Sequence, residues 1–192
     1  QSRVQSAQEL QVAGQAELLV RMHSPVIGPR EAPVTIVEFF DPACETCRAF
    51  YPVVKELMQQ YPTEVRLVIR YAPFHQGSEQ VVKLLESARR QDKYLAVLEA
   101  VLAAQPQWAD HGNPNLELAY KAAEQAGLDM QRARADIADP ALDAVVLQDV
   151  QDLTALKVEK TPTFFVNGRP LPSFGHKQLT DLVAQEVSKT KK

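Results

Sequence analysis

Two cysteines separated by two residues are the part of this sequence best suited to covalent chemistry. Cys44 and Cys47 are the only cysteines among 192 residues. They follow an apolar segment, Val34 to Phe40, which predicts a buried strand, and they precede a segment that predicts a helix. The first sulfur then lies at the helix N-terminus, where unpaired N–H groups and the helix dipole stabilise a thiolate. A thiolate in that position is suited to thiol-disulfide exchange.

Two other interpretations of a cysteine pair are a zinc site and a purely structural disulfide. A structural zinc site needs about four ligands, commonly two such pairs or one pair with closely spaced histidines. The four histidines are scattered and show no such spacing: His23, His75, His111 and His176. The sequence therefore predicts no metal site. A structural disulfide stays open, because extracytoplasmic proteins carry them.

Length, composition and charge limit the other classes of function. A chain of 192 residues with 45% hydrophobic residues can bury one substantial core, with or without an inserted subdomain. The net charge of −3 and the pI near 5.8 argue against a nucleic-acid partner. No apolar stretch is long enough to cross a membrane, and the sequence starts at Gln1 rather than at Met. We interpret this start as the removal of a signal peptide or of a membrane anchor, and expect a periplasmic or otherwise extracytoplasmic protein.

The strand before the cysteines contains one acidic residue. Along Val34–Phe40 both alternating sets of side chains are apolar or β-branched, except Glu38, so the strand should be covered on both faces. A carboxylate there must be desolvated or paired. A buried acid close to a reactive thiol pair is a candidate functional residue. The alternative is an exposed glutamate on an edge strand.

The next segments complete a strand–helix–strand unit. Apolar residues recur at helical spacing between Cys44 and Tyr61, interrupted by Pro52, which should kink the helix. Residues Val65 to Tyr71 then predict a second strand. The right-handed crossover rule makes the two strands parallel neighbours, with the cysteines at the carboxyl end of the first.

A helical insertion interrupts the sheet. Residues 77–157 contain no convincing strand and predict four or five helices, with breaks at 105–114, 127–129 and 139–140. The loop around Trp108 and His111 is the most irregular of them, and a packed aromatic residue is favoured there over a binding site.

Two further strands and a helix follow the insertion. Residues 161–166 predict a strand, Asn167–Gly168 a hairpin turn, and 169–171 the returning strand, while 177–187 predict a closing helix. The expected fold class is α/β, in four parts: an N-terminal helical arm (1–24), a first part of the sheet domain (25–76), the helical insertion (77–157) and a second part of the sheet domain (158–192).

The N-terminal segment could make a subunit contact. Residues 1–22 are rich in glutamine and carry a thin apolar stripe at helical spacing, formed by Val12, Ala16 and Leu19. The stripe is compatible with packing on the domain or with homo-oligomerisation through residues 1–22.

Over residues 25–189 the sequence resembles the thioredoxin superfamily, and more closely its DsbA-type branch, which has a helical domain inserted into a thioredoxin fold. The buried acid of that branch lies six residues before the first cysteine, as Glu38 does. Its helix proline lies eight residues after that cysteine, as Pro52 does, and its cis-proline matches Pro162. Each match is weak alone, but together they are specific.

The resemblance implies a mechanism. Cys44 is the expected nucleophile and Cys47 the resolving thiol, and no cofactor beyond a redox-active Cys44–Cys47 disulfide is needed. Glu38 would have a raised pKa and exchange a proton with Cys47. Thr161 and the cis Pro162 would bind an extended segment of a client protein. The partners are client proteins with thiols or disulfides and a membrane or soluble redox partner.

Two departures from the family leave the direction of electron flow open. Glu45 stands where the family often has proline, and Thr46 stands where DsbA has histidine. An anionic neighbour disfavours the Cys44 thiolate, so a weaker oxidant than DsbA is expected. Thr161 before the cis-proline is similar to isomerases of the DsbC and DsbG type and to ScsC. Isomerases generally need two active sites facing one client, so an oligomer would favour isomerisation.

The alternative from another class is a non-enzymatic Cu(I)-binding protein, because two thiolates can hold this soft ion without further ligands. Exchange chemistry uses Glu38 and Pro162, whereas copper carriage does not require them. One further role is open: the family has a basic residue near the position of Arg70 that faces the acid, so Arg70 either reaches Glu38 or is exposed to solvent.

Overall fold

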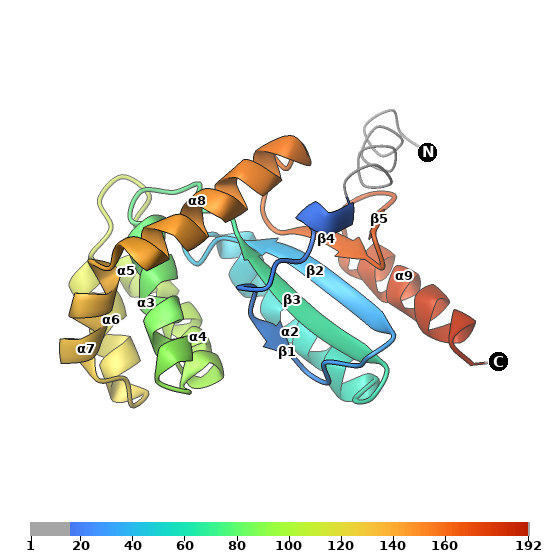
Figure 1. Cartoon of the computed structure of the whole chain (residues 1–192), viewed down its shortest axis with the longest axis horizontal. Helices are drawn as coiled ribbons and strands as arrows, with labels where there is room; N and C mark the ends of the chain where they lie inside the picture. Colours follow the sequence, from blue (N-terminus) through green and yellow to red (C-terminus); the bar gives the residue numbers. More distant parts are fainter. Residues whose placement is uncertain (1–15, 192) are drawn as a thin grey trace. The chain divides into compact units, whose positions relative to one another are not determined.

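The computed structural model describes residues 16–191, which divide into two compact units (Figure 1). Among the described residues, the first unit contains residues 16–39, the segment Ala49–Arg70 and residues 152–191. The second unit contains Phe40–Arg48 and Tyr71–Gln151. Within the described range, no helix combines the length and the apolar character needed to cross a bilayer.

The sheet has five strands in the order β1-β3-β2-β4-β5. Their bounds are Val26–Ile27 for β1, Val34–Phe40 for β2, Val65–Tyr71 for β3, Thr163–Val166 for β4 and Arg169–Pro170 for β5. The backbone N–H of Val34 donates to the carbonyl of Glu64 at 2.9 Å, and that of Ala72 donates to Phe40 at 2.8 Å. The start of β2 therefore lies beside the start of β3, and the end of β2 beside the end of β3. The two strands are parallel neighbours, as predicted.

The central strands have the predicted bounds because five of the seven residues in each are apolar and buried. Strand β1 was not predicted. Its two residues lie between Pro25 and Gly28, and they pair antiparallel with β3, whose Ile69 N–H also donates to the Pro25 carbonyl at 3.0 Å. A strand of two residues leaves no alternating pattern to read, so the proline-rich composition suggested only a break in the chain.

The hairpin after the insertion forms as predicted. Asn167 and Gly168 have φ angles of 48° and 81°, the left-handed backbone that a two-residue hairpin turn requires and that this dipeptide tolerates. They connect β4 to β5, which pair antiparallel. Strand β4 begins at Thr163, two residues later than expected. The peptide bond between Thr161 and Pro162, just before it, is cis, as predicted.

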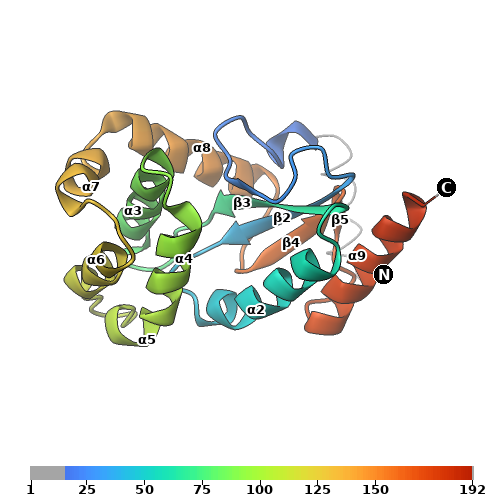
Figure 2. The ribbon, with the colours of Figure 1, turned by 90° about the horizontal axis from the view of Figure 1, so that it is seen from below.

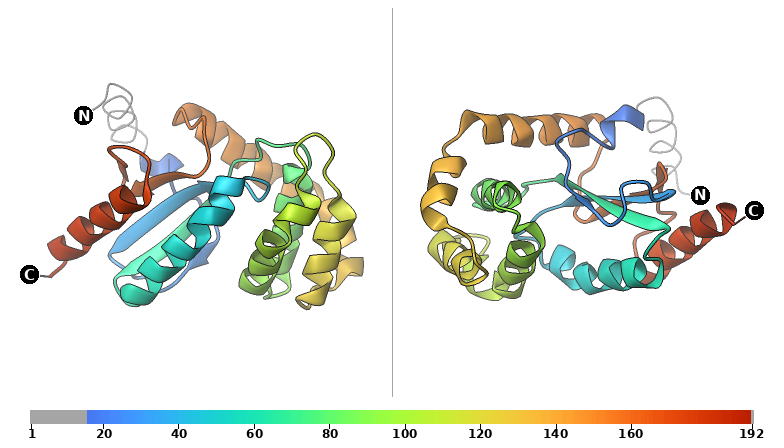
Figure 3. Two further views of the ribbon diagram at one scale, coloured as in Figure 1. Left: turned by 180° about the vertical axis from the view of Figure 1, so that it is seen from behind. Right: turned by 60° about the horizontal axis from the view of Figure 1, so that its bottom comes forward.

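Two helices accompany the sheet. Helix α2 (Glu45–Gln60) contains Pro52, and helix α9 (His176–Lys189) packs against β4. From Ala49 onward α2 lies with α9 along the same face of the sheet (Figures 2 and 3).

The second unit is mainly helical. Its helices are α3 (Ser78–Arg90), α4 (Tyr94–Ala103), α5 (Gln105–Trp108), α6 (Leu116–Gln125), α7 (Met130–Ile137) and α8 (Pro140–Ala155), the last ending in the first unit. Helix α3 packs against α4, α6 and α7. The structure thus has six helices where four or five were predicted, because a single helical turn, α5, forms within the stretch expected to be irregular. Trp108 at the end of that turn is fully buried, which confirms its reading as a packed aromatic residue.

The predicted N-terminal helix is wrong for its described part. Residues 16–22 form one short 3₁₀ turn, η1 (Ala16–Leu18), followed by irregular chain. Leu19 is buried at 5% exposure, whereas the Met22 side chain is fully exposed. Residues 1–15, which include Val12 of the expected stripe, lie outside the described range, and so does most of the proposed subunit contact.

Candidate functional site

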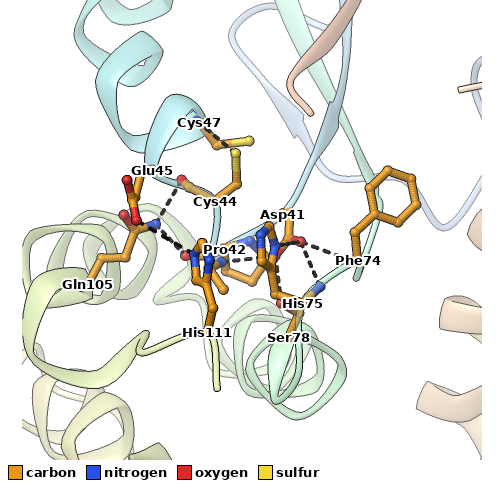
Figure 4. A network of polar contacts seen from close by, with 11 residues as sticks. Asp41, Pro42, Cys44, Glu45, Cys47, Phe74, His75, Ser78, Gln105 and His111 are labelled. Atoms are coloured by element: carbon orange, nitrogen blue, oxygen red, sulfur yellow. Dashed lines mark hydrogen bonds and ion pairs between the residues drawn. The ribbon is translucent and has the colours of Figure 1, made fainter. Parts of the chain in front are cut away.

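The cysteine pair occupies the start of α2, as predicted. Cys44 directly precedes the helix, and its Sγ accepts a hydrogen bond from the backbone N–H of Cys47 at 3.3 Å. The two sulfur atoms lie side by side (Figure 4). Cys44 is 7% exposed and Cys47 1%, so Cys44 is the more accessible of two mostly buried residues. An N–H group of the first turn aimed at the first sulfur stabilises negative charge on it.

Asp41 organises the loop that leads from β2 to the cysteines. Its fully buried carboxylate accepts hydrogen bonds from the backbone N–H of Ala43 at 2.9 Å and from the Ser78 hydroxyl at 2.6 Å through one oxygen. The other oxygen accepts from the N–H groups of Phe74 and His75, at 2.9 and 3.2 Å. One aspartate thereby fixes the loop before the cysteines to the segment that follows β3.

His75 and His111 extend this network from Asp41 to Glu45, which lies between the two cysteines. The Nδ1 atom of His75 lies 2.7 Å from an Asp41 carboxylate oxygen. The imidazole of His75 contacts that of His111, with ring centroids 4.3 Å apart. The Nε2 atom of His111 lies 3.6 Å from a carboxylate oxygen of Glu45, the residue after the first cysteine. Figure 4 shows these four side chains in sequence, two carboxylates with two imidazoles between them.

Gln105 holds the cysteine loop from helix α5. Its Nε2 atom donates to the carbonyl oxygens of Pro42 at 2.8 Å and Cys44 at 2.9 Å. The side chain is 1% exposed, and its Oε1 atom has no hydrogen-bond partner among the described residues. Burial of an amide with one unsatisfied atom is costly, and the two hydrogen bonds to the loop offset part of that cost.

The other predicted site residues belong to the first unit. Glu38 is buried at 5% exposure in β2, opposite Phe164 of β4, so the interpretation of an exposed glutamate is wrong. Thr161 and Pro162 directly precede β4, whose first residue pairs with Phe39. The acid and the proline segment therefore lie on neighbouring strands. Their roles in catalysis and client binding stay predictions.

Arg70 is also buried, so the prediction of a solvent-exposed arginine is wrong. Its side chain is fully inaccessible, its guanidinium donates to Asp152 at 2.5 Å and to the carbonyl of Leu18, and it lies over the ring of Phe39 at 5.5 Å.

No group of three or more histidine, cysteine, aspartate or glutamate side chains within residues 16–191 has a geometry that could hold a metal ion.

The sequence did not predict roles for Asp41 and Gln105 or the association of His75 with His111. Asp41 carries one signal, its position directly after a buried strand and just before the cysteines. The histidines are 36 residues apart and were judged by their spacing along the chain, whereas they meet through tertiary contacts. Gln105 carries no sequence signal that separates it from the other glutamines.

Comparison with protein families gives one match that covers most of the chain. The sequence profile of the family described as Thioredoxin matches residues 21–184. Among curated proteins, the chain is 39% identical over 147 residues to the Na(+)/H(+) antiporter NhaA 3 of Salinispora tropica, and 32% identical over 144 residues to NhaA of Herminiimonas arsenicoxydans. In both cases the match covers 75% of this chain but only 22% of the relative, so the chain spans less than a quarter of the length of these proteins.

Several solved structures have a similar fold. A thioredoxin-like oxidoreductase from Silicibacter pomeroyi is 30% identical, with a TM-score of 0.77, over 91% of this chain and 98% of that one. The thiol-disulfide exchange protein alpha-DsbA2 from Wolbachia pipientis is 17% identical, with a TM-score of 0.80, over 96% and 98%. The catalytic domain of Proteus mirabilis ScsC is 19% identical, with a TM-score of 0.77, over 94% and 98%. These similarities confirm the predicted thioredoxin fold with additional helices.

Proposed function

Because the chain belongs to the thioredoxin family, we propose that it is a protein thiol-disulfide oxidoreductase that exchanges disulfides with client proteins through Cys44 and Cys47. The observation that carries the proposal is the hydrogen bond from the Cys47 N–H to the Cys44 sulfur at the start of α2. A sulfur held by a helix N-terminus is a better leaving group and is ionised at lower pH than a free thiol. The similarity to a thioredoxin-like oxidoreductase and to a thiol-disulfide exchange protein supports the same assignment.

The reaction is a pair of sulfur exchanges. In the oxidising direction, a client thiolate attacks Cys44 of the Cys44–Cys47 disulfide, which gives a mixed disulfide and releases Cys47 as a thiolate. A second client thiolate then attacks the client sulfur of the mixed disulfide and expels Cys44 as a thiolate. The client gains one disulfide and the pair gains two electrons. The reducing direction is the reverse, in which the Cys47 thiolate attacks Cys44 and expels the client.

Three residues complete the proposed mechanism. Glu38 exchanges a proton with Cys47 during resolution, and its burial supports this role because a desolvated carboxyl group takes up a proton more readily. Thr161 and Pro162 present backbone to an extended client segment. No cofactor other than the cysteine pair is required.

The proposed location is extracytoplasmic, in the periplasm or an equivalent oxidising compartment, because client disulfides persist there. A redox partner, membrane-bound or soluble, must accept or supply two electrons to reset the pair after each turnover. Whether the chain acts as an oxidase, or as an isomerase or reductase, depends on the reduction potential of the pair. A value near that of DsbA, about −120 mV, indicates an oxidase, and a value near that of thioredoxin, about −270 mV, indicates a reductase or isomerase.

Trapping of the mixed disulfide tests the proposal. The variant Cys47→Ala cannot resolve, so on incubation with a scrambled or disulfide-containing client it should accumulate a covalent adduct that dithiothreitol releases. Cys44→Ala, the matched control, should form none. The wild-type disulfide form should oxidise a reduced, unfolded client, or the dithiol form should reduce insulin. A protein that neither traps a client nor changes the disulfides of either substrate is not an oxidoreductase of proteins.

A further inference from the structure

The contacts around Glu45 suggest how the cysteine pair is tuned. Glu45 follows Cys44 directly, and its carboxylate lies 3.6 Å from His111. The ring of His111 contacts the ring of His75, which is held by the buried carboxylate of Asp41 at 2.7 Å. An uncompensated carboxylate beside Cys44 would disfavour a thiolate there, whereas a protonated imidazole beside that carboxylate would cancel the effect.

The loop that carries His111 is anchored so that the histidine stays near Glu45. The indole N–H of the buried Trp108 donates to the Val101 carbonyl at 2.9 Å. The N–H of Asn115, at the other end of the loop, donates to the Trp108 carbonyl at 2.8 Å. The six residues between these two positions therefore form a loop with fixed ends, and His111 stands in the middle of it.

We propose that His111, supported by His75 and Asp41, is a positioning residue for the redox pair: it holds and neutralises Glu45, and so sets the reactivity of Cys44. The inference rests on the proposed function, because it concerns the regulation of the same site. Two histidines from distant segments neutralise Glu45 in this proposal. The other residue between the cysteines, Thr46, carries no charge and cannot do so.

The positions of the side chains indicate that the histidines influence Cys44 through Glu45. In Figure 4 the imidazoles lie on the opposite side of the Cys44 backbone from the sulfur atoms, while Glu45 and the cysteines share the start of α2. The histidines therefore act on Cys44 mainly through the charge of Glu45. Because Glu45 and His111 are exposed at 74% and 50% of their side chains, the effect of this ion pair is expected to be small.

Charged and neutral polar groups from several segments surround the two histidines. The loop after β2 contributes Asp41 and helix α2 contributes Glu45, while Asp110 precedes His111 on its own loop and accepts a hydrogen bond from Gly112. Helix α3 contributes the neutral Ser78, and its Glu79 pairs with Lys83 at 3.4 Å. Helix α5 contributes the neutral Gln105. The charged groups that contact the imidazoles, Asp41 and Glu45, are therefore both carboxylates.

The ionisation of Cys44 tests the proposal without a client. In a Cys47→Ser background, only Cys44 contributes thiolate absorbance, which is followed against pH alongside the alkylation rate with iodoacetamide. His111→Ala should move the midpoint of the Cys44 titration upward by about half a pH unit, and Glu45→Gln should move it downward. The double variant should behave like Glu45→Gln alone. The matched control His176→Ala, an exposed histidine of α9, should leave the midpoint unchanged.

Two results would overturn the inference: a midpoint that His111→Ala does not move, or an equal upward shift with and without Glu45. Circular dichroism establishes that each variant is folded, and His111→Gln replaces His111→Ala if the smaller side chain unfolds the loop. Because ionisation is read without exchange, a protein that fails to exchange disulfides can still support or overturn this role. Failure of the proposed function and failure of this inference are thus separate outcomes.

The equilibrium with glutathione provides a second measurement. The Cys44–Cys47 disulfide reacts with two glutathione thiols to give the dithiol and one glutathione disulfide. At pH 6 the dithiol form of His111→Ala should be less favoured than that of the wild type by about threefold, because the Glu45 charge is no longer compensated. In a Glu45→Gln background, the two equilibrium constants should agree. A difference that is the same with and without the Glu45 carboxylate would mean a purely structural role and would contradict the proposal.

Discussion

The side-chain amide of Gln105 donates a hydrogen bond to the carbonyl oxygen of Cys44 at 2.9 Å, although 61 residues separate them in the chain. The same nitrogen donates to the Pro42 carbonyl at 2.8 Å. The reactive cysteine is therefore held by a residue of the helical insertion as well as by its own helix. Within the second unit, helix α5 thus supplies a hydrogen-bond donor to the cysteine loop that the CxxC motif itself does not contain.

The variant Gln105→Leu should lower both stability and thiol reactivity. Loss of the two hydrogen bonds leaves buried carbonyl oxygens without these donors, at a cost of about 1 to 2 kcal/mol in the free energy of unfolding. A looser cysteine loop should also slow alkylation of Cys44. Gln105→Glu should be worse than Gln105→Leu at neutral pH, because a carboxylate would face two carbonyl oxygens. Denaturant unfolding and the iodoacetamide rate measure the two effects.

Gln107→Leu is the matched control for this prediction, since Gln107 is exposed in the same helical turn. It should leave both quantities unchanged. If Gln105→Leu matched the wild type in stability and alkylation, Gln105 would not position the loop.

Replacement of Glu38 by glutamine should slow resolution of the mixed disulfide while the fold is retained. The amide preserves the shape of the buried side chain, but it cannot accept a proton from Cys47. Loss of general acid-base assistance at this position should reduce the rate by about tenfold or more. Rapid mixing with a client disulfide, followed by acid quenching, gives the rate of adduct decay. Glu56→Gln, an exposed residue of α2, is the control, and unchanged kinetics in Glu38→Gln would remove this residue from the mechanism.

The features predicted from the sequence were those that local patterns specify. Strands β2 and β3 are apolar on both faces, Asn167–Gly168 can adopt two left-handed backbone positions, and Cys44 with Cys47 form a motif. Each of these depends on residues that are close in the chain. These features can therefore be recognised in the sequence before the fold is known.

The parts that were missed depend on contacts between distant segments. His75, His111 and Glu45 come from the loop after β3, the loop after α5 and the start of α2, and no spacing along the chain connects them. The solvent-exposed alternative for Arg70 is wrong, because the side chain is buried and forms a salt bridge with Asp152, 82 residues later in the chain. A single sequence shows that such a polar residue is present, but not which partner the fold provides.

The Asp152 salt bridge should make stability depend on pH at the acidic end. Burial raises the pKa of this carboxyl group, but hydrogen bonds from Arg21 and Arg70 outweigh burial and hold the pKa below its ordinary value. An acid whose pKa is lower in the folded state stabilises the fold above the unfolded-state pKa, and this contribution is lost as the pH falls through the folded-state pKa. Asp152→Asn should therefore cost about 3 kcal/mol at pH 7, where it removes the charge that pairs with the buried guanidinium of Arg70.

The difference between Asp152→Asn and the wild type should shrink as the pH falls below about 4, where this carboxylate becomes protonated in the unfolded chain before it does in the folded one. Thermal unfolding between pH 7 and pH 3 measures it. Asp181→Asn, which removes an exposed pairing with Lys177 on α9, should cost less than about 0.5 kcal/mol at every pH. Equal stabilities of Asp152→Asn and the wild type at pH 7 would show that the buried pair does not stabilise the fold.

Glu86 should produce the opposite pH dependence in the helical unit. Its side chain is buried and accepts a hydrogen bond from the Tyr71 hydroxyl at 2.7 Å, while Arg89 lies 2.9 Å away. Burial raises the pKa of Glu86 by more than Arg89 and Tyr71 lower it. An acid with a raised pKa in the folded state costs stability while it is charged, and this cost disappears as the pH falls through the folded-state pKa toward the unfolded-state value. The wild type should thus gain stability relative to Glu86→Gln between pH 7 and pH 4, by about 1 kcal/mol.

Denaturant unfolding of both proteins across this range measures the gain. Glu124→Gln, at an exposed position of α6, is the control, and its curve should run parallel to that of the wild type. A constant difference between Glu86→Gln and the wild type would mean that the carboxyl group keeps the same proton affinity in the folded and unfolded chains.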